Sequence, residues 1–209
     1  MRGGRFMPYN VRAEKERLRR KILLARGRLR PADLQAAAVA LRDVLLSVPE
    51  VSRAAVVAAY VGVGTEPGTG PILDALHRRG VRVLLPVLRP DRDLDWGVYT
   101  GPEALARAHF GLLEPTGPRL GPQAVATADA VLLPGLAVDR TGMRLGRGGG
   151  SYDRVLPRVA PEAFTCVLLH DGELLEGPVP SEHTDQRVRA AALPSGLLRF
   201  PATPNDALP

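Results

Sequence analysis

The segment RLGRGGGSYDR, from Arg144 to Arg154, has the residue types expected of a site that binds an anion. Its three successive glycines, 148–150, leave their backbone N–H groups free of neighbouring side chains, and such groups form an anion-binding concavity. A helix that begins just after the glycines would add its N-terminal dipole, although Pro157 must end or kink it early. The run therefore predicts a phosphate cradle, with positive charge supplied by Arg144 and Arg147.

Asp153 is the unexpected member of this segment. A carboxylate beside phosphates repels them unless a cation lies between, which suggests Mg²⁺. The segment is not a Walker A loop, because no Gly-Lys-Ser/Thr follows at the required spacing, and it is not a Gly-x-Gly-x-x-Gly dinucleotide fingerprint. Taken alone, the glycines are equally compatible with a flexible surface loop, and Asp153 with a carboxylate favoured by a helix dipole.

Four further residues could do chemistry. Lys15 and Arg19 are four residues apart on one helix face, where like charges destabilise the helix unless an anion lies between them; the alternative is a solvated basic face. Glu66 lies in GTEPGTG, a loop with little else that is polar, and is otherwise a plain turn glutamate. Trp96, the single tryptophan, could stack on a ligand ring, but a packing role is favoured.

Metal and nucleophile chemistry finds little support elsewhere. The four histidines lack metal-ligand spacing and pair with no Ser or Cys in a catalytic motif. His183 lies near Asp185 and is of most interest, whereas His77 and His109 are expected on the surface. The single Cys166 excludes an internal disulfide and a multi-cysteine metal site, and its apolar context FTCVLL predicts buried packing.

Length and composition fit one globular domain. The chain has 209 residues, of which 45% are apolar, a net charge of +6 and a pI near 10.2. The excess is almost all arginine, forms no polybasic block and has no interleaved aromatics, so small anions are favoured over a nucleic acid as partner. No apolar run reaches membrane-spanning length and the N-terminus lacks the apolar region of a signal peptide, so we expect a cytoplasmic protein that does not span a membrane.

Apolar runs and helical periodicities alternate along the chain. This order predicts a single three-layer α/β domain, residues 1–200, with a mostly parallel sheet flanked by helices, followed by a flexible tail, residues 201–209. Ligands bind such sheets beyond the carboxyl ends of the strands. The loop that carries Glu66 (the Glu66 loop, residues 60–70) and the glycines of residues 146–150 (the glycine run) are both expected there. The expected helices are 12–30, a second beginning at Pro31, 68–80 and 101–111, and the expected strands are 53–64, 81–88, 93–101, 128–139, 163–169 and 186–194.

The stretch VLLPGLAVDRTGMRLGRGGGSYDRVL is similar to the signature of the 5-formyltetrahydrofolate cyclo-ligase family, also called 5,10-methenyltetrahydrofolate synthetases. That signature runs Pro-Gly-Leu-Ala-Phe-Asp, then Arg-Leu-Gly-x-Gly-x-Gly-x-Tyr-Asp. Shorter family pieces occur in the same order, so the resemblance covers roughly residues 12–200. The matching residues are Lys15, Leu18, Arg19, Tyr60, Glu66, Gly111, Glu114, Pro115, Pro180, Glu182 and Asp185. The departures are Val138 for the usual Phe, Ser151 for a bulkier residue, Arg189 for an acidic one and Leu193 for Thr.

The resemblance implies a monomeric enzyme that uses ATP and Mg²⁺ to convert 5-formyltetrahydrofolate to 5,10-methenyltetrahydrofolate, releasing ADP and phosphate. The alternative is a homologue that binds nucleotide or folate without turnover. The resemblance implies catalytic roles for Arg144, Arg147 and Tyr152, the last being otherwise a core-facing ring, and a metal site at Asp153 and Asp185, the latter being otherwise a turn aspartate. For ATP it implies Lys15, Arg19, Arg144, Gly146, Arg147, Gly148, Gly149, Gly150, Ser151 and Tyr152. For the reduced folate it implies Glu66, Arg147, Gly148, Gly149, Gly150 and Ser151.

Overall fold

The computed structural model describes residues 10–201. The expected tail lies outside this range apart from Pro201, as do residues 1–9 of the N-terminal stretch that we expect to lack a signal peptide. Helix α1 (Val11–Arg26) begins at Asn10, whose side chain accepts a hydrogen bond from the Ala13 amide. It ends four residues earlier than predicted, and α2 (Pro31–Ser47) begins at the expected proline, which holds the preceding residue in an extended conformation.

A seven-stranded sheet forms the centre of the molecule, in the order β12-β11-β9-β6-β1-β2-β3. The five strands from β11 to β2 are parallel to one another, and β12 and β3 pair antiparallel at the two edges. The predicted mostly parallel sheet is thus confirmed, with an additional hairpin strand, β12, that the sequence did not predict. The bounds are β1 (Val56–Ala58), β2 (Arg82–Leu88), β3 (Leu94–Val98), β6 (Ala130–Pro134), β9 (Phe164–Leu168), β11 (Ala190–Leu193) and β12 (Gly196–Arg199).

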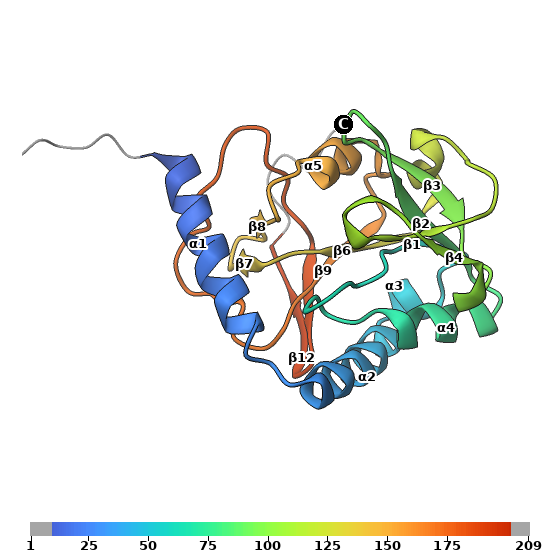
Figure 1. Ribbon diagram of the computed structural model, residues 1–209, viewed down its shortest axis with the longest axis horizontal. Helices are drawn as coiled ribbons and strands as arrows, with labels where there is room; N and C mark the ends of the chain where they lie inside the picture. The colour runs from blue at the N-terminus through green and yellow to red at the C-terminus, as the bar shows by residue number, and fades with distance from the viewer. Residues whose placement is uncertain (1–9, 202–209) are drawn as a thin grey trace, which may run out of the picture.

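Successive strand residues enter two different cores, which makes the domain three-layered. Val57 and Leu132 pack on one face with the buried side chains of α2, α3 (Pro49–Ser52) and α4 (Gly70–Arg78). Ala58 and Leu133 pack on the other face, against Val155 of α5 (Ser151–Val155) and Val125 of a 3₁₀ turn. In Figure 1, α2 and α4 lie below the sheet, α5 lies above it, and α1 stands at the left.

Two small sheets carry segments of the candidate site. Strands β7 (Ala137–Asp139), β8 (Arg144–Leu145) and β10 (Leu174–Leu175) form a three-stranded sheet beside α1 (Figure 1). Strands β4 (Leu105–Arg107) and β5 (Leu113–Pro115) form a two-stranded ribbon. The predicted helix over 101–111 is therefore wrong, because Leu105 and its neighbours pair with β5 and only single 3₁₀ turns flank them.

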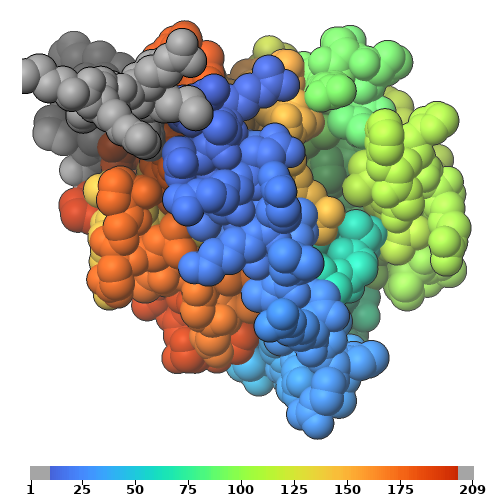
Figure 2. All heavy atoms as spheres, turned by 60° about the vertical axis from the view of Figure 1, so that its left-hand side comes forward, coloured from blue at the N-terminus to red at the C-terminus, as the bar shows by residue number. Residues whose placement is uncertain are grey.

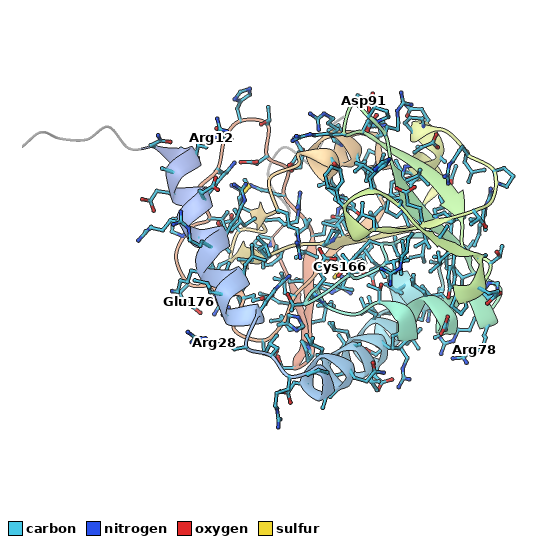
Figure 3. The ribbon with its side chains drawn as sticks, viewed as in Figure 1. Arg12, Arg28, Arg78, Asp91, Cys166 and Glu176 are labelled. Carbon is cyan, nitrogen blue, oxygen red and sulfur yellow. The ribbon has the colours of Figure 1, made fainter. Side chains whose placement is uncertain are left out.

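Cys166 lies at the centre of the sheet, in the interior seen in Figure 3. Burial raises the pKa of its thiol to about 12, so it is a packing residue, as predicted. Trp96 is also fully buried, in the core on the α5 side of the sheet, which confirms packing over ligand stacking. Among residues 10–201, no helix combines the length and the apolar composition that crossing a bilayer requires.

Candidate active site

A cavity of about 320 Å³ opens at the carboxyl ends of β1, β2 and β6. Figure 2 shows α1 in blue against the amber residues near 150, with the yellow-green segment near 110 across a hollow in the surface. The glycine run, the Glu66 loop, α1 and the segment before β11 each contribute to its wall. The cavity is lined by every residue that the sequence proposed for the site: Lys15, Arg19, Glu66, Arg144, Gly146, Arg147, Gly148, Gly149, Gly150, Ser151, Tyr152, Asp153 and Asp185.

Lys15 is buried between two carboxylates rather than exposed on a basic helix face. Its Nζ lies 2.6 Å from Asp185 and 3.0 Å from Glu182. Burial disfavours its charge, but the hydrogen bonds to these two carboxylates outweigh that effect and raise the pKa of Lys15 above its ordinary value. The chain itself thus supplies negative charge that offsets the charge of Lys15.

Arg19 contacts the glycine run directly. Its Nε donates to the Gly146 carbonyl at 2.9 Å. Gly148 has φ +101°, and a Cβ at that position would lie 3.2 Å from the Arg19 guanidinium carbon. Glycine is needed here both for the backbone conformation and for the close approach of α1, so the helix that carries Lys15 and Arg19 lies against the predicted phosphate cradle.

The buried Arg144 and the partly buried Tyr152 lie together in the cavity wall. The Arg144 guanidinium lies 3.0 Å from Asp153 and 5.9 Å from the centre of the Tyr152 ring, while its Nε has no hydrogen-bond partner. The Tyr152 hydroxyl is buried without a partner as well. Burial, and then the nearby Glu66 carboxylate, raise the pKa of Tyr152, so this phenol stays protonated and can donate a hydrogen bond.

Arg147 bridges the cavity to Glu66. Arg147 Nε lies 2.9 Å from Glu66 Oε1, and the Val63 amide donates to the other Glu66 oxygen at 3.1 Å. The Arg147 side chain is 51% exposed and that of Glu66 only 10%. This pair therefore joins the glycine run to the Glu66 loop across the space that a ligand would enter.

The carboxylates of the site fit a magnesium ion shared with phosphates. Asp153 and Asp185 both line the cavity, and Arg144 lies close enough to both that each opposes the lowering of the Arg144 pKa by burial. Within the part of the chain that the structure describes, no group of three or more His, Cys, Asp or Glu side chains could hold a metal on its own. Two carboxylates suit Mg²⁺, which usually takes one or two protein carboxylates together with phosphate oxygens and water.

The helix expected after the glycines is short. Gly150, at φ +70°, precedes α5, and a 3₁₀ turn that contains Pro157 follows at once, so the proline ends the helix as predicted. Ser151 lines the cavity, whereas Val138 and Leu193 are buried in the sheets. Of the departures from the family signature, only Ser151 therefore contacts the cavity; Val138, Arg189 and Leu193 lie outside its wall.

One wall of the cavity is apolar, and no sequence pattern predicted it. Phe110 is 90% exposed beside the cavity, at a φ of 59° that non-glycine residues rarely adopt. The exposed aromatic in the turn HFG, just before a glycine, is the one local signal that marks this wall. The remaining apolar residues of this wall are Pro86, Leu88, Leu94, Leu112 and Leu113.

The histidines take no part in the cavity wall. His77 and His109 are exposed, as predicted. His183 is exposed too and does not line the cavity, despite its closeness in sequence to Asp185. His170 is buried and hydrogen-bonds outside the cavity.

Comparison with known proteins gives a consistent result. The model of the 5-formyltetrahydrofolate cyclo-ligase family matches residues 11–194. A 5-formyltetrahydrofolate cyclo-ligase of Mycolicibacterium smegmatis is 43% identical over 176 residues, 82% of this chain and 89% of the relative. One from Escherichia coli is 31% identical over 72% of this chain and 84% of its own length. The NMR structure of Aquifex aeolicus 5,10-methenyltetrahydrofolate synthetase superposes with a TM-score of 0.77 at 26% identity, covering 90% of this chain and 94% of that one.

Proposed function

Because this chain belongs to the 5-formyltetrahydrofolate cyclo-ligase family, we propose that it converts 5-formyltetrahydrofolate to 5,10-methenyltetrahydrofolate with ATP and Mg²⁺, releasing ADP and phosphate. The observation that carries the proposal is the division of one cavity into a wall of cations, glycines and two carboxylates and an opposite apolar wall. These two surfaces suit a nucleotide phosphate chain and the rings of a reduced folate, respectively. All thirteen proposed residues line this one cavity, and we propose that the protein acts as a monomer in the cytoplasm.

We assign the triphosphate to the glycine run and α1. Backbone N–H groups of Gly148, Gly149 and Gly150 would hold phosphate oxygens, and Arg19 and Lys15 would add positive charge from the facing helix. Asp153 and Asp185 would hold Mg²⁺, which when bound neutralises charge on the phosphates.

We assign the pterin of the folate to Glu66 and the apolar wall. A pterin edge presents N–H donors, which suit the acceptor oxygens of a carboxylate. Glu66 is held in place by the Val63 amide and is nearly buried, so its carboxylate is poorly satisfied by solvent. The exposed Phe110 ring, together with Leu112, suits an aromatic part of the same ligand.

The proposed reaction requires positioning and charge neutralisation more than acid–base chemistry. The formyl oxygen attacks the γ-phosphorus and ADP leaves. The neighbouring amine of the folate itself then attacks the formyl carbon and loses its proton. The bond between that carbon and the phosphorylated oxygen breaks, which releases phosphate. Arg144 and Arg147 would stabilise charge on the transferring phosphoryl group, and Tyr152 would donate a hydrogen bond in the cavity, since burial keeps it protonated.

A direct assay tests the proposal. The protein is mixed with 5-formyltetrahydrofolate, ATP and Mg²⁺, and the near-ultraviolet absorbance of the methenyl product is followed, with ATP or Mg²⁺ omitted as controls. We expect product only in the complete mixture. A folded protein that binds both substrates but forms no product would instead be a non-catalytic binding homologue.

A further inference from the structure

A buried polar network lies outside the cavity and connects α1 to the loop that carries Glu66. It begins at Arg26 in the last turn of α1, a residue only 1% exposed. The Arg26 guanidinium makes two hydrogen bonds to the Glu173 carboxylate, at 2.6 and 2.7 Å, and one to the Gly135 carbonyl at 2.7 Å. Burying two charges costs desolvation free energy, which is offset only where the ion pair has short hydrogen bonds. The two short bonds between Arg26 and Glu173 meet that condition and fix the two side chains relative to each other.

Glu173 fixes the orientation of a tight turn. The turn runs from His170 to Glu173, with Gly172 at φ +86°, and its backbone is closed by a 3.2 Å bond from the Glu173 amide to the His170 carbonyl. Glu173 Oε2 also accepts from the His170 amide at 2.8 Å. His170 is therefore held at both backbone groups by a residue that is itself held by α1.

The His170 ring reaches the Glu66 loop from this turn. Its Nε2 lies 3.1 Å from the carbonyl of Thr65, the residue before Glu66. A carbonyl oxygen only accepts, so Nε2 carries the proton and donates. Other hydrogen bonds that hold the backbone of this loop come from Tyr60, Glu66 and Thr69, which are local to it. Among residues 10–201, His170 alone holds the loop backbone by a hydrogen bond from a distant part of the chain.

We propose that His170 is a positioning residue for the folate: its Nε2–H, anchored through Glu173 and Arg26 to α1, fixes the Thr65 carbonyl and thereby sets where the Glu66 carboxylate stands. The inference rests on the proposed function, because Glu66 is assigned to the pterin there. Since His170 contacts neither the glycine run nor the proposed metal carboxylates, its direct effect is on the backbone of the Glu66 loop.

The test compares His170→Ala with His170→Gln, whose side-chain amide can donate at about the reach of Nε2. We expect His170→Ala to raise the KM for 5-formyltetrahydrofolate about tenfold, the effect of losing one buried hydrogen bond, with the KM for ATP and kcat unchanged. His170→Gln should restore the wild-type KM. Hydrogen–deuterium exchange of residues 62–68, which needs no substrate, should quicken in His170→Ala and not in His170→Gln. Asp171→Ala is the matched control, because Asp171 lies in the same turn but bonds to Ser195.

Each outcome decides between distinct conclusions. If both KM values rise together in His170→Ala, or if His170→Gln is as impaired as His170→Ala, the positioning role is refuted and the residue is merely structural. An unchanged folate KM with unchanged loop exchange also refutes it. If the wild-type protein neither binds nor converts 5-formyltetrahydrofolate, the proposed function fails first, and the assignment of His170 to the folate fails with it.

Discussion

The ion pair between Arg147 and Glu66 must break before Arg147 can bind phosphates or Glu66 can bind the pterin. We therefore predict that this pair opposes the binding of both ligands. Glu66 is assigned to the folate, and Arg147 is assigned to the phosphates as well, yet the two side chains neutralise each other at 2.9 Å. Glu66→Gln should therefore tighten the binding of a non-hydrolysable ATP analogue, because it releases Arg147 for the phosphates. The same substitution should weaken folate binding.

The magnitudes follow from the exposure of the two side chains. Arg147 is 51% exposed, so solvent screens the pair and its contribution is about 1 kcal/mol, which corresponds to roughly fivefold tighter nucleotide binding when the pair is removed. Glu66 is 10% exposed, and losing its charge as a hydrogen-bond acceptor costs about 2 kcal/mol, or roughly thirtyfold weaker folate binding.

Isothermal titration calorimetry at fixed Mg²⁺ measures both effects. Glu176→Gln is the matched control, since it removes a carboxylate from an exposed pair with Arg140 that lies outside the cavity. The tighter nucleotide binding caused by Glu66→Gln should vanish in an Arg147→Ala background. Tightening that persists in that background would mean that general loss of negative charge is the cause, and unchanged or weaker nucleotide binding in Glu66→Gln would refute the competition itself.

Three other substitutions separate chemistry from stability. Asp153→Asn should lower Mg²⁺-dependent turnover about a hundredfold while thermal unfolding shows a folded protein; a protein that simply unfolds would make Asp153 structural. Tyr152→Phe should lower kcat/KM about tenfold without loss of stability in urea unfolding, because its buried hydroxyl has no partner; equal activity would remove Tyr152 from the reaction. Asp139 accepts hydrogen bonds from Val179, Thr141 and Met143. Burial raises the pKa of Asp139, but these hydrogen bonds outweigh burial and hold the pKa below the ordinary 3.8. Its stabilisation is thus complete above that value and is lost as the pH falls through the lowered pKa; Asp139→Asn should cost about 2 kcal/mol at pH 7 and flatten the acid end of the stability curve, and an unchanged curve would refute this.

The central sheet could be predicted because most of its strands are local apolar runs in the sequence. The apolar run at 163–169 became β9, and the first part of the run at 128–139 became β6; both are buried on both faces as parallel strands require. The prediction of one strand over 128–139 was wrong in its second part, because residues 137–139 form β7 of the small three-stranded sheet instead. The small sheet could not be predicted in this way. Val138 pairs with Leu174, 36 positions away, in strands of two or three residues that have no periodicity to detect.

Helix α1 shows why the buried face of a helix can be misread. Leu18, Ile22, Ala25 and Leu29 recur at helical spacing, which favours an apolar stripe on this helix, but Ala25 is exposed. The buried residues of this helix are Lys15, Ile22 and Arg26. Lys15 pairs with Asp185, 170 positions along the chain, and Arg26 pairs with Glu173, 147 positions along. No local sequence pattern reveals these carboxylate partners.

The helix predicted over 101–111 failed for a related reason. Leu105, Ala106 and Arg107 suit a helix by intrinsic propensity, but pairing with β5 outweighs that preference. The same error concealed the apolar wall, because Phe110 and Leu112 reach the cavity only once the β4–β5 ribbon turns back. The charged wall was easier to predict, since most of it occupies one continuous glycine-rich segment.

The pairing of Lys15 with Asp185 has a consequence for how the protein is made. During synthesis, Lys15 emerges from the ribosome 170 residues ahead of its carboxylate partner, and Arg26 emerges 147 residues ahead of Glu173. Until those carboxylates follow, α1 has cations where its docking face should be and little apolar surface to hold it in place. Helix α1 is therefore among the last of these elements to dock, and a nascent chain that stops before residue 185 lacks one of the carboxylates of the proposed site.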